Sequence, residues 1–358
     1  MRGRLETLRG GACLLLVLYH VIGMDGSSGL RIGEGWLRIA SDWLALVRMP
    51  LFAFLAGWFY AERPVLAGQA GAFIQGKAER LLLPLVTVGT LYLIAQAVAP
   101  GVNHRATAIP FLMPVAHLWF IQALFIIFVV VAAAERGGLL RDLNRWYVAM
   151  AVAATVYLSG VTTPWLAIGG VLYLLPYVLL GIGLRRFGDM RRLQDPACMI
   201  VLMSAAWALA AASSADFNEE RRTAAYLALA TCLVLLALAS RWRSELLIRV
   251  GGSSYAIFLF HAFFTAGSRI VLERAGVSSL AILVPAGMLS GVLGPLLVHR
   301  YFKNKTVAAA LFLGTGWPRA VDTRTAERFR PAVLPAGTET VQATAASGIS
   351  NSLASRRT

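Results

Sequence analysis

The amino-acid sequence predicts an all-α fold, a polytopic membrane bundle of about ten transmembrane helices with both termini in the cytoplasm. Two observations predict this fold class. Of the 358 residues, 58% are hydrophobic and only 14% are charged, whereas soluble domains are about half apolar and a quarter charged. The apolar residues also gather in long runs, separated by charged or Pro- and Gly-rich breaks. Together these features exclude a soluble globular domain.

The apolar runs define the individual helices. A helix needs about 20 apolar residues to cross a hydrocarbon core of roughly 30 Å. A cleaved signal peptide is the rival interpretation of the first run, but no small-residue cleavage site follows it and nine more runs do. Cutting the chain at its breaks gives the following spans, of which the first and fifth are short: 10–25, 43–60, 81–99, 118–134, 146–160, 164–184, 198–213, 224–240, 254–272 and 280–299.

The basic residues between the spans predict the orientation. Short cytoplasmic loops carry an excess of Lys and Arg. Of the basic residues outside the spans and the C-terminal tail, 19 lie in the two end segments and every second connection, and 6 lie in the remaining connections. This alternation indicates an even number of spans and two cytoplasmic termini.

The chain divides into two regions. Residues 1–314 form the predicted membrane domain, and residues 315–358 are rich in Ala, Thr, Ser, Gly, Pro and Arg, which predicts a disordered cytoplasmic tail. The net charge of +15 is explained by the loops, so we expect no nucleic-acid partner. The three cysteines lie in apolar runs without metal-ligand spacing, so no metal site is predicted. The abundance of Ala, Arg and Gly suggests a bacterium of high genomic G+C content, and therefore the cytoplasmic membrane.

Among the side chains inside the spans, Arg48, Arg269, His20 and His261 are candidates for function. Ionisable groups at membrane depth are costly, and they usually face the interior of the bundle. Both arginines lie towards the external end of their spans, so snorkelling to the interface explains them equally well.

The first helix has the most informative arrangement. Arg9 and His20 are eleven residues apart, so at about 100° per residue they share one helix face, about 16 Å apart along the axis. Glu6 lies on the same side and can orient Arg9. A neutral imidazole can take a proton from an alcohol that attacks an acyl group. A lone histidine in an apolar helix is often a hydrogen-bonded core residue, and both interpretations stay open.

A second basic group precedes the third span. Lys77 and Arg80 are three residues apart and therefore adjacent on a helix surface. Cations near the cytoplasmic end of a cavity would suit a donor rich in phosphate. The preference of cytoplasmic loops for positive charge is enough to explain the position of either residue taken alone.

Five segments, in this order, resemble the motifs of the acyltransferase 3 family, integral membrane O-acyltransferases that modify sugars and polysaccharides. The resemblance covers about residues 5 to 300. The segments are LRGGACLLLVLYH (8–20), MPLFAFLAG (49–57), KAERLLLP (77–84), HLWFI (117–121) and GSSYAIFLFH (252–261).

The resemblance implies transfer of an acyl group, commonly acetyl from acetyl-CoA, to a hydroxyl of a sugar, polysaccharide or glycolipid. It implies that His20 is the catalytic base, that Arg9 is its partner near the donor, and that Lys77 and Arg80 are the basic pair of the third-helix motif. We expect Arg9, Lys77 and Arg80 to hold the phosphates of acyl-CoA. The expected partners are a carbohydrate or lipid-linked glycan acceptor and the membrane lipids. Direct transfer and a transient acyl-enzyme both fit these residues.

Three further residues match motif positions without an assigned role: Trp119, Tyr255 and His261. As candidates they would bind substrate, and so would Glu6 and Arg48. An interfacial aromatic side chain explains Trp119, and hydrogen bonds between packed helices explain Tyr255 and His261, and we favour these structural interpretations.

The chain departs from the family pattern at three places. The basic pair of the family is often two arginines, but its first member here is Lys77. A lysine cannot bind phosphate in a bidentate manner. Ala56 replaces the serine that usually precedes Gly57, which removes a hydroxyl but keeps a close helix approach. Arg48 stands where sugar-modifying relatives often have histidine, which suggests an altered, anionic acceptor.

The main alternative is a multi-pass transporter or flippase, because embedded Arg and His residues also suit a solute pathway. Transporters commonly show two related halves, and the sequence shows none. A non-catalytic scaffold would explain the composition but not the five ordered segments.

Overall fold

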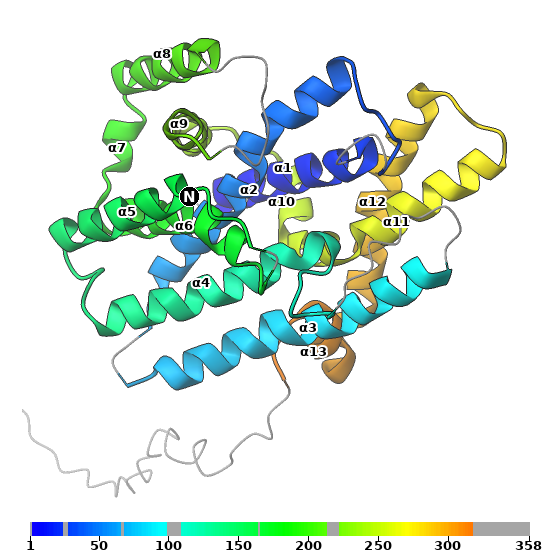
Figure 1. The fold of residues 1–358 in the computed structure, drawn as a ribbon, viewed down its shortest axis with the longest axis horizontal. Coiled ribbons are helices and arrows are strands. Elements are labelled where there is room, and N and C mark those ends of the chain that lie inside the picture. Colours follow the sequence, from blue (N-terminus) through cyan, green and yellow to red (C-terminus); the bar gives the residue numbers. More distant parts are fainter. Residues whose placement is uncertain are drawn as a thin grey trace, which may run out of the picture. The chain divides into compact units, whose positions relative to one another are not determined.

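The protein is helical throughout the part that the structure describes (Figure 1). This computed structural model describes residues 2–23, 28–65, 68–98, 109–163, 165–212 and 222–317, and these residues contain no β-strand. The prediction of an all-α fold is therefore confirmed. The helices are α1 (Arg2–Ile22), α2 (Trp36–Glu62), α3 (Ala70–Val98), η1 (Ala116–Leu118), α4 (Trp119–Arg136), α5 (Leu143–Leu158), α6 (Ile168–Phe187), α7 (Met190–Leu193), α8 (Pro196–Ala212), α9 (Ala224–Ala239), α10 (Glu245–Gly252), α11 (Ser254–Arg274), α12 (Leu280–Phe302) and α13 (Thr306–Leu313).

Each predicted span coincides with a helix, but fewer than ten of these helices have the length of a membrane span. In the described residues, seven helices are long and apolar enough to cross: α1, α2, α3, α4 with η1, α6, α11 and α12. Helices α5, α8 and α9 have only 16 or 17 residues, about 24–26 Å at 1.5 Å per residue, which is short of a core of roughly 30 Å. The count of ten spans and the position of the termini stay predictions.

Three helices begin well before the predicted spans. The structure starts α1 at Arg2, α2 at Trp36 and α3 at Ala70, although the apolar runs begin later. The charged residues that interrupt an apolar run therefore lie within the helices. The predicted tail lies outside the described residues, apart from residues 315–317.

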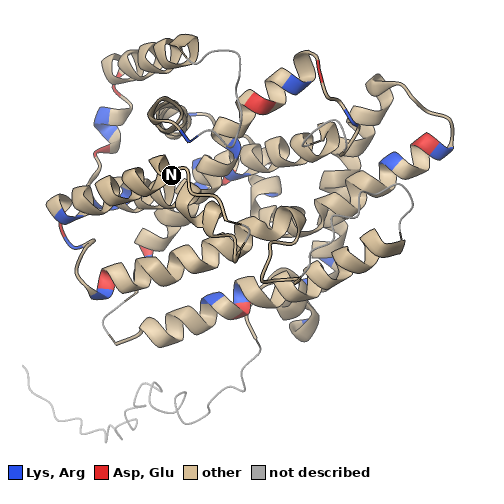
Figure 2. Ribbon diagram, viewed as in Figure 1, with Lys and Arg blue, Asp and Glu red and all other residues tan. Residues whose placement is uncertain are grey.

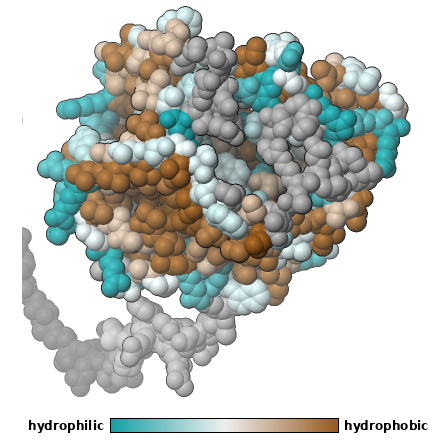
Figure 3. All heavy atoms as spheres, in the orientation of Figure 1, coloured by the Kyte–Doolittle hydropathy of each residue, from teal (hydrophilic) through white to brown (hydrophobic). Residues whose placement is uncertain are grey.

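The exposed surface is that of a membrane protein. Large apolar side chains with more than half of their surface exposed occur on several helices, and examples are Ile94, Val152, Val201, Val271 and Leu297. Figure 2 shows the charged residues mostly near helix ends and connections, with tan central stretches between them. On the face shown in Figure 3, apolar side chains form a broad area and polar ones gather mainly near its edges. Hydrocarbon lipid tails would cover such an area without cost.

The first half of α1 is fixed against α10 by a close approach of two backbones. A Cβ atom on Gly10 would overlap the carbonyl oxygen of Leu247, and a Cβ atom on Gly251 would overlap the carbonyl oxygen of Glu6. Small residues permit helices to approach this closely. The contact therefore lies at the start of the first family-like segment and directly before the last one.

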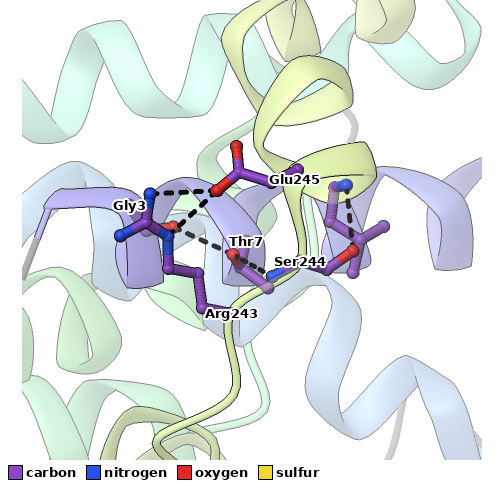
Figure 4. A network of polar contacts seen from close by, with 6 residues as sticks. Gly3, Thr7, Arg243, Ser244 and Glu245 are labelled. Carbon is purple, nitrogen blue, oxygen red and sulfur yellow. Dashed lines mark hydrogen bonds and ion pairs between the residues drawn. The ribbon is translucent and has the colours of Figure 1, made fainter.

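A polar network closes the same contact, as Figure 4 shows. The Thr7 hydroxyl donates to the carbonyl of Gly3 at 2.9 Å and accepts from the amide of Ser244 at 3.2 Å. Arg243 donates to the Glu245 carboxylate at 2.9 Å beside it. These bonds satisfy polar groups at the start of α1 and fix the entry to α10.

Helices α2 and α6 meet in the same way. A Cβ atom on Gly57 would overlap the carbonyl oxygen of Val178, and one on Gly181 would overlap the carbonyl oxygen of Phe54. The close approach expected of Gly57 is therefore present, although Ala56 replaces the usual serine. Helix α2 also packs against α1 and α9, so it lies among the helices that carry the candidate residues.

Candidate functional site

Three histidine rings from separate elements meet inside the bundle. The ring centroid of His261 in α11 lies 4.7 Å from that of His20 in α1 and 4.8 Å from that of His117 in η1. The centroids of His20 and His117 are 5.7 Å apart. His261 is fully buried and His117 is 6% exposed, whereas His20 is only partly buried. His20 is therefore the most exposed member of the cluster.

His117 is the functional candidate that the sequence analysis missed. The fourth predicted span begins at residue 118, which leaves His117 just outside it, in a connection. The available signal was its position as first residue of the HLWFI segment. Its neighbour Ala116 has a φ of 44°, a left-handed conformation that costs roughly 1–2 kcal/mol for a residue with a Cβ atom. Strained residues of this kind cluster at functional sites.

Aromatic side chains enclose the three histidines. Tyr19 packs edge-on against His20 at 5.2 Å between ring centroids. Tyr92 and Phe258 contact His117 at 5.5 and 5.8 Å. Such walls exclude water from the inner side of the cluster, which strengthens electrostatic interactions there.

Arg48 lies beside this cluster and is buried. Its side chain is 2% exposed, and its guanidinium carbon lies 3.7 Å from the centroid of the Tyr19 ring. Arg38, which forms an ion pair with Asp42, approaches the same ring at 5.9 Å. The snorkelling interpretation of Arg48 is thus wrong, because cation–π packing holds its side chain inside the bundle. The structure brings Arg48 towards His20.

Arg9 and Glu6 form an ion pair on α1, as the sequence indicates. The Arg9 guanidinium carbon also lies 5.3 Å from the centroid of the Phe59 ring of α2. Arg9 and His20 belong to one continuous helix, so they are separated by about 16 Å along its axis. The guanidinium of Arg9 and the imidazole of His20 therefore lie about three helical turns apart along α1.

Lys77 lies on aromatic rings near the end of α2. Its ammonium is 3.8 Å from the ring centroid of Phe128 and 5.3 Å from that of Phe73. Tyr60 packs on both of these rings, with centroids 6.0 and 5.6 Å away. Because Arg9 packs on the preceding residue of α2, Phe59, the end of α2 brings Arg9 and Lys77 to one region.

The side chain of Arg80 is exposed, while its backbone carbonyl accepts a hydrogen bond from the Tyr255 hydroxyl at 2.8 Å. Tyr255 therefore packs α11 against α3. This contact favours the structural interpretation of Tyr255, and it places Tyr255 at the basic segment and not at the histidine cluster.

Trp119 lies against α6. A Cβ atom on Gly170 would come within 2.6 Å of the Trp119 indole, so the indole packs directly on the backbone there. The described ring contacts of Trp119 include Phe120 at 6.2 Å and no histidine. Helix packing thus accounts for the position of Trp119. Among the described residues, no ring contact connects Trp119 to His20.

No group of three or more His, Cys, Asp or Glu side chains in the described ranges is arranged to hold a metal ion. The site offers two kinds of functional group. Cationic side chains lie at the end of α2, and a partly exposed imidazole, that of His20, lies further along α1. The first suit a phosphate-bearing ligand, and the second suits proton transfer.

The comparisons with known proteins show the family. A family model described as an acyltransferase domain, that of the acyltransferase 3 family, matches residues 2–300, from α1 into α12. The matched part contains all three histidines, Arg9 and Lys77. No curated protein and no solved structure matches the chain significantly. Because the model covers nearly the whole chain, the protein belongs to the acyltransferase 3 family.

Proposed function

We propose that this membrane protein is an O-acyltransferase that moves an acyl group, in the first place acetyl, from acyl-CoA to a hydroxyl of a sugar, polysaccharide or glycolipid. The acyltransferase 3 family implies acyl transfer. The observation that carries the finer proposal is the partly exposed ring of His20, on the same helix as the Arg9–Glu6 ion pair.

In this proposal the donor enters from the cytoplasm. Arg9, Lys77 and Arg80 bind the phosphates of the coenzyme, and the acyl thioester extends along α1 towards His20. The aromatic contacts of Arg9 and Lys77 support this role, because they hold two cations near the end of α2 with little loss of side-chain freedom on binding. The acyl group then lies about 16 Å deeper than the cations.

His20 acts as general base. In direct transfer, the acceptor oxygen forms a bond with the thioester carbonyl carbon while its proton moves to a ring nitrogen of His20. The tetrahedral oxyanion collapses, the C–S bond breaks, and the coenzyme leaves as a thiolate that takes the proton back from His20. General base catalysis of this kind contributes typically 10²–10⁴-fold to the rate, so this is about the loss expected without the imidazole. We place the enzyme in the bacterial cytoplasmic membrane.

The test is transfer of label from radiolabelled acetyl-CoA to glycans in membranes of cells that make the native glycans. Wild type is compared with His20→Gln at matched expression. His299→Gln is the matched control, because His299 is a histidine of α12 that bonds to Ser253 at 2.8 Å, away from the cluster. We expect His20→Gln alone to abolish labelling.

Equal labelling by all three proteins would make His20 a packing residue and refute the mechanism. If wild type itself labels no glycan, the donor or acceptor is wrong, and uptake of solutes by vesicles becomes the assay for the transporter alternative.

A further inference from the structure

His261 has one ring nitrogen whose state is set by its own helix. Nδ1 lies 2.9 Å from the backbone carbonyl oxygens of both Ile257 and Phe258. Carbonyl oxygens only accept hydrogen bonds, so Nδ1 must carry a proton and donate it. A neutral imidazole has a single N–H, and a charged ring without a counter-ion is costly in so apolar a site. Nε2 of His261 therefore presents a lone pair.

That lone pair accepts no hydrogen bond from the described residues in this arrangement of the rings. His261 is fully buried, and a buried acceptor without a partner costs about 1–3 kcal/mol. The ring N–H groups of His20 and His117 are close enough to satisfy it, since their centroids are 4.7 and 4.8 Å away. Two imidazoles joined by an N–H···N bond of about 3 Å have centroids about 5 Å apart.

We propose that Nε2 of His261 accepts the N–H of His20 and so positions His20 as the catalytic base. His20 is favoured over His117 as the donor because His20 is the partly exposed ring. With one nitrogen bonded to His261, its other nitrogen keeps a free lone pair on the side that a substrate can reach. His261 would then act through His20, as the carboxylate does in a Ser-His-Asp triad.

This role rests on the proposed function and adds no proton transfer to it. The acceptor proton moves to the free nitrogen of His20 and returns to the leaving thiolate, while the N–H shared with His261 stays on His20. His261 stabilises the imidazolium through that bond and remains neutral throughout. The fixed ring also prevents the tautomer of His20 that has its proton on the substrate side.

The test compares substitutions at residue 261 in the full-length protein in membranes, using label transferred from radiolabelled acetyl-CoA to the native glycans. His261→Phe keeps a ring and removes the acceptor, whereas His261→Gln places an amide oxygen near the position of Nε2. Thr265→Val is the matched control, because Thr265 is a buried residue one turn further along α11 whose hydroxyl donates to a carbonyl of the same helix, that of Ala262, at 3.3 Å.

We expect His261→Phe to lower the maximal rate about 10- to 100-fold with an unchanged KM for acetyl-CoA, because one transition-state hydrogen bond is lost. His261→Gln should regain most of that rate, and Thr265→Val should match wild type. If His261→Phe does not insert stably, His261→Met removes the same acceptor with a flexible side chain.

Three outcomes would overturn this role of His261. A rate for His261→Phe equal to that of Thr265→Val makes His261 a packing residue. An equal loss of maximal rate in His261→Phe and His261→Gln shows that the hydrogen-bond acceptor at residue 261 is not needed. A loss of maximal rate in His117→Phe as large as that in His261→Phe assigns the hydrogen bond to His117. Failure of wild type to label any glycan refutes the proposed function instead, so the two failures are distinguishable.

Discussion

The contact between α1 and α10 leads to a prediction that neighbouring glycines can test. In Gly251→Ala the new Cβ atom would overlap the carbonyl oxygen of Glu6 and would come within 3.2 Å of the Gly10 nitrogen. All of these atoms are backbone, so no side chain can rotate to relieve the clash. In Gly252→Ala the new Cβ atom would meet no described atom within 4 Å. The two variants therefore differ in the clash alone.

The magnitude follows from two opposing effects. Inserting a methyl group into a packed contact costs typically about 1–3 kcal/mol. Replacing glycine by alanine inside a helix gains up to about 1 kcal/mol from backbone entropy, and it does so at either position of α10. We therefore expect Gly251→Ala to be about 1–3 kcal/mol less stable than Gly252→Ala, a difference of several degrees in Tm.

The assay is thermal unfolding of the purified protein in detergent, followed by intrinsic tryptophan fluorescence, for wild type and both variants. Gly10→Ala and Gly11→Ala repeat the comparison from the α1 side, since a Cβ atom on Gly11 also meets no described atom within 4 Å. Equal melting temperatures within each pair would show that the helices can separate freely, and this would refute the argument from close backbone approach.

Two further variants test the basic segment. Tyr255→Phe removes the hydroxyl that donates to the carbonyl of Arg80, so the protein should lose about 1 kcal/mol of stability in the same melting assay. Its labelling rate per folded molecule should stay near that of wild type, and a rate loss beyond tenfold would contradict a purely structural role of Tyr255. Lys77→Gln removes the charge and with it the cation–π contact on Phe128, so the KM for acetyl-CoA should rise about tenfold with little change in maximal rate. An unchanged KM would exclude Lys77 from donor binding.

Sequence reasoning located the helices well because long apolar runs are a local signal. The predicted number of spans, ten, exceeds the seven described helices that are long enough to cross a membrane. An apolar run does not show how far its helix continues into the charged residues that flank it. The clearest case is α3, which begins at Ala70, so that Lys77 and Arg80 lie two turns and more inside the helix.

The histidine cluster could be predicted only in part. The phase of Arg9 and His20 on one helix is a property of local periodicity, and the structure retains it. The meeting of His20 with His117 and His261 depends on how three distant segments pack, which periodicity does not contain. The burial of Arg48 on Tyr19 is of the same kind, since an arginine near a span end fits an interfacial and an interior position equally well from sequence.

The glycine contact and the histidine cluster are parts of one arrangement. Gly10 and Gly251 meet at the contact between α1 and α10, and each is followed ten residues later by a histidine of the cluster, His20 and His261. Helices α10 and α11 are separated only by Ser253, so the contact determines where α11 begins relative to α1. Displacing it by the width of a methyl group would shift His261 against His20 by a distance that matters to a hydrogen bond. Gly10, in the first family-like segment, and Gly251, directly before the last one, thus set the register of the two rings.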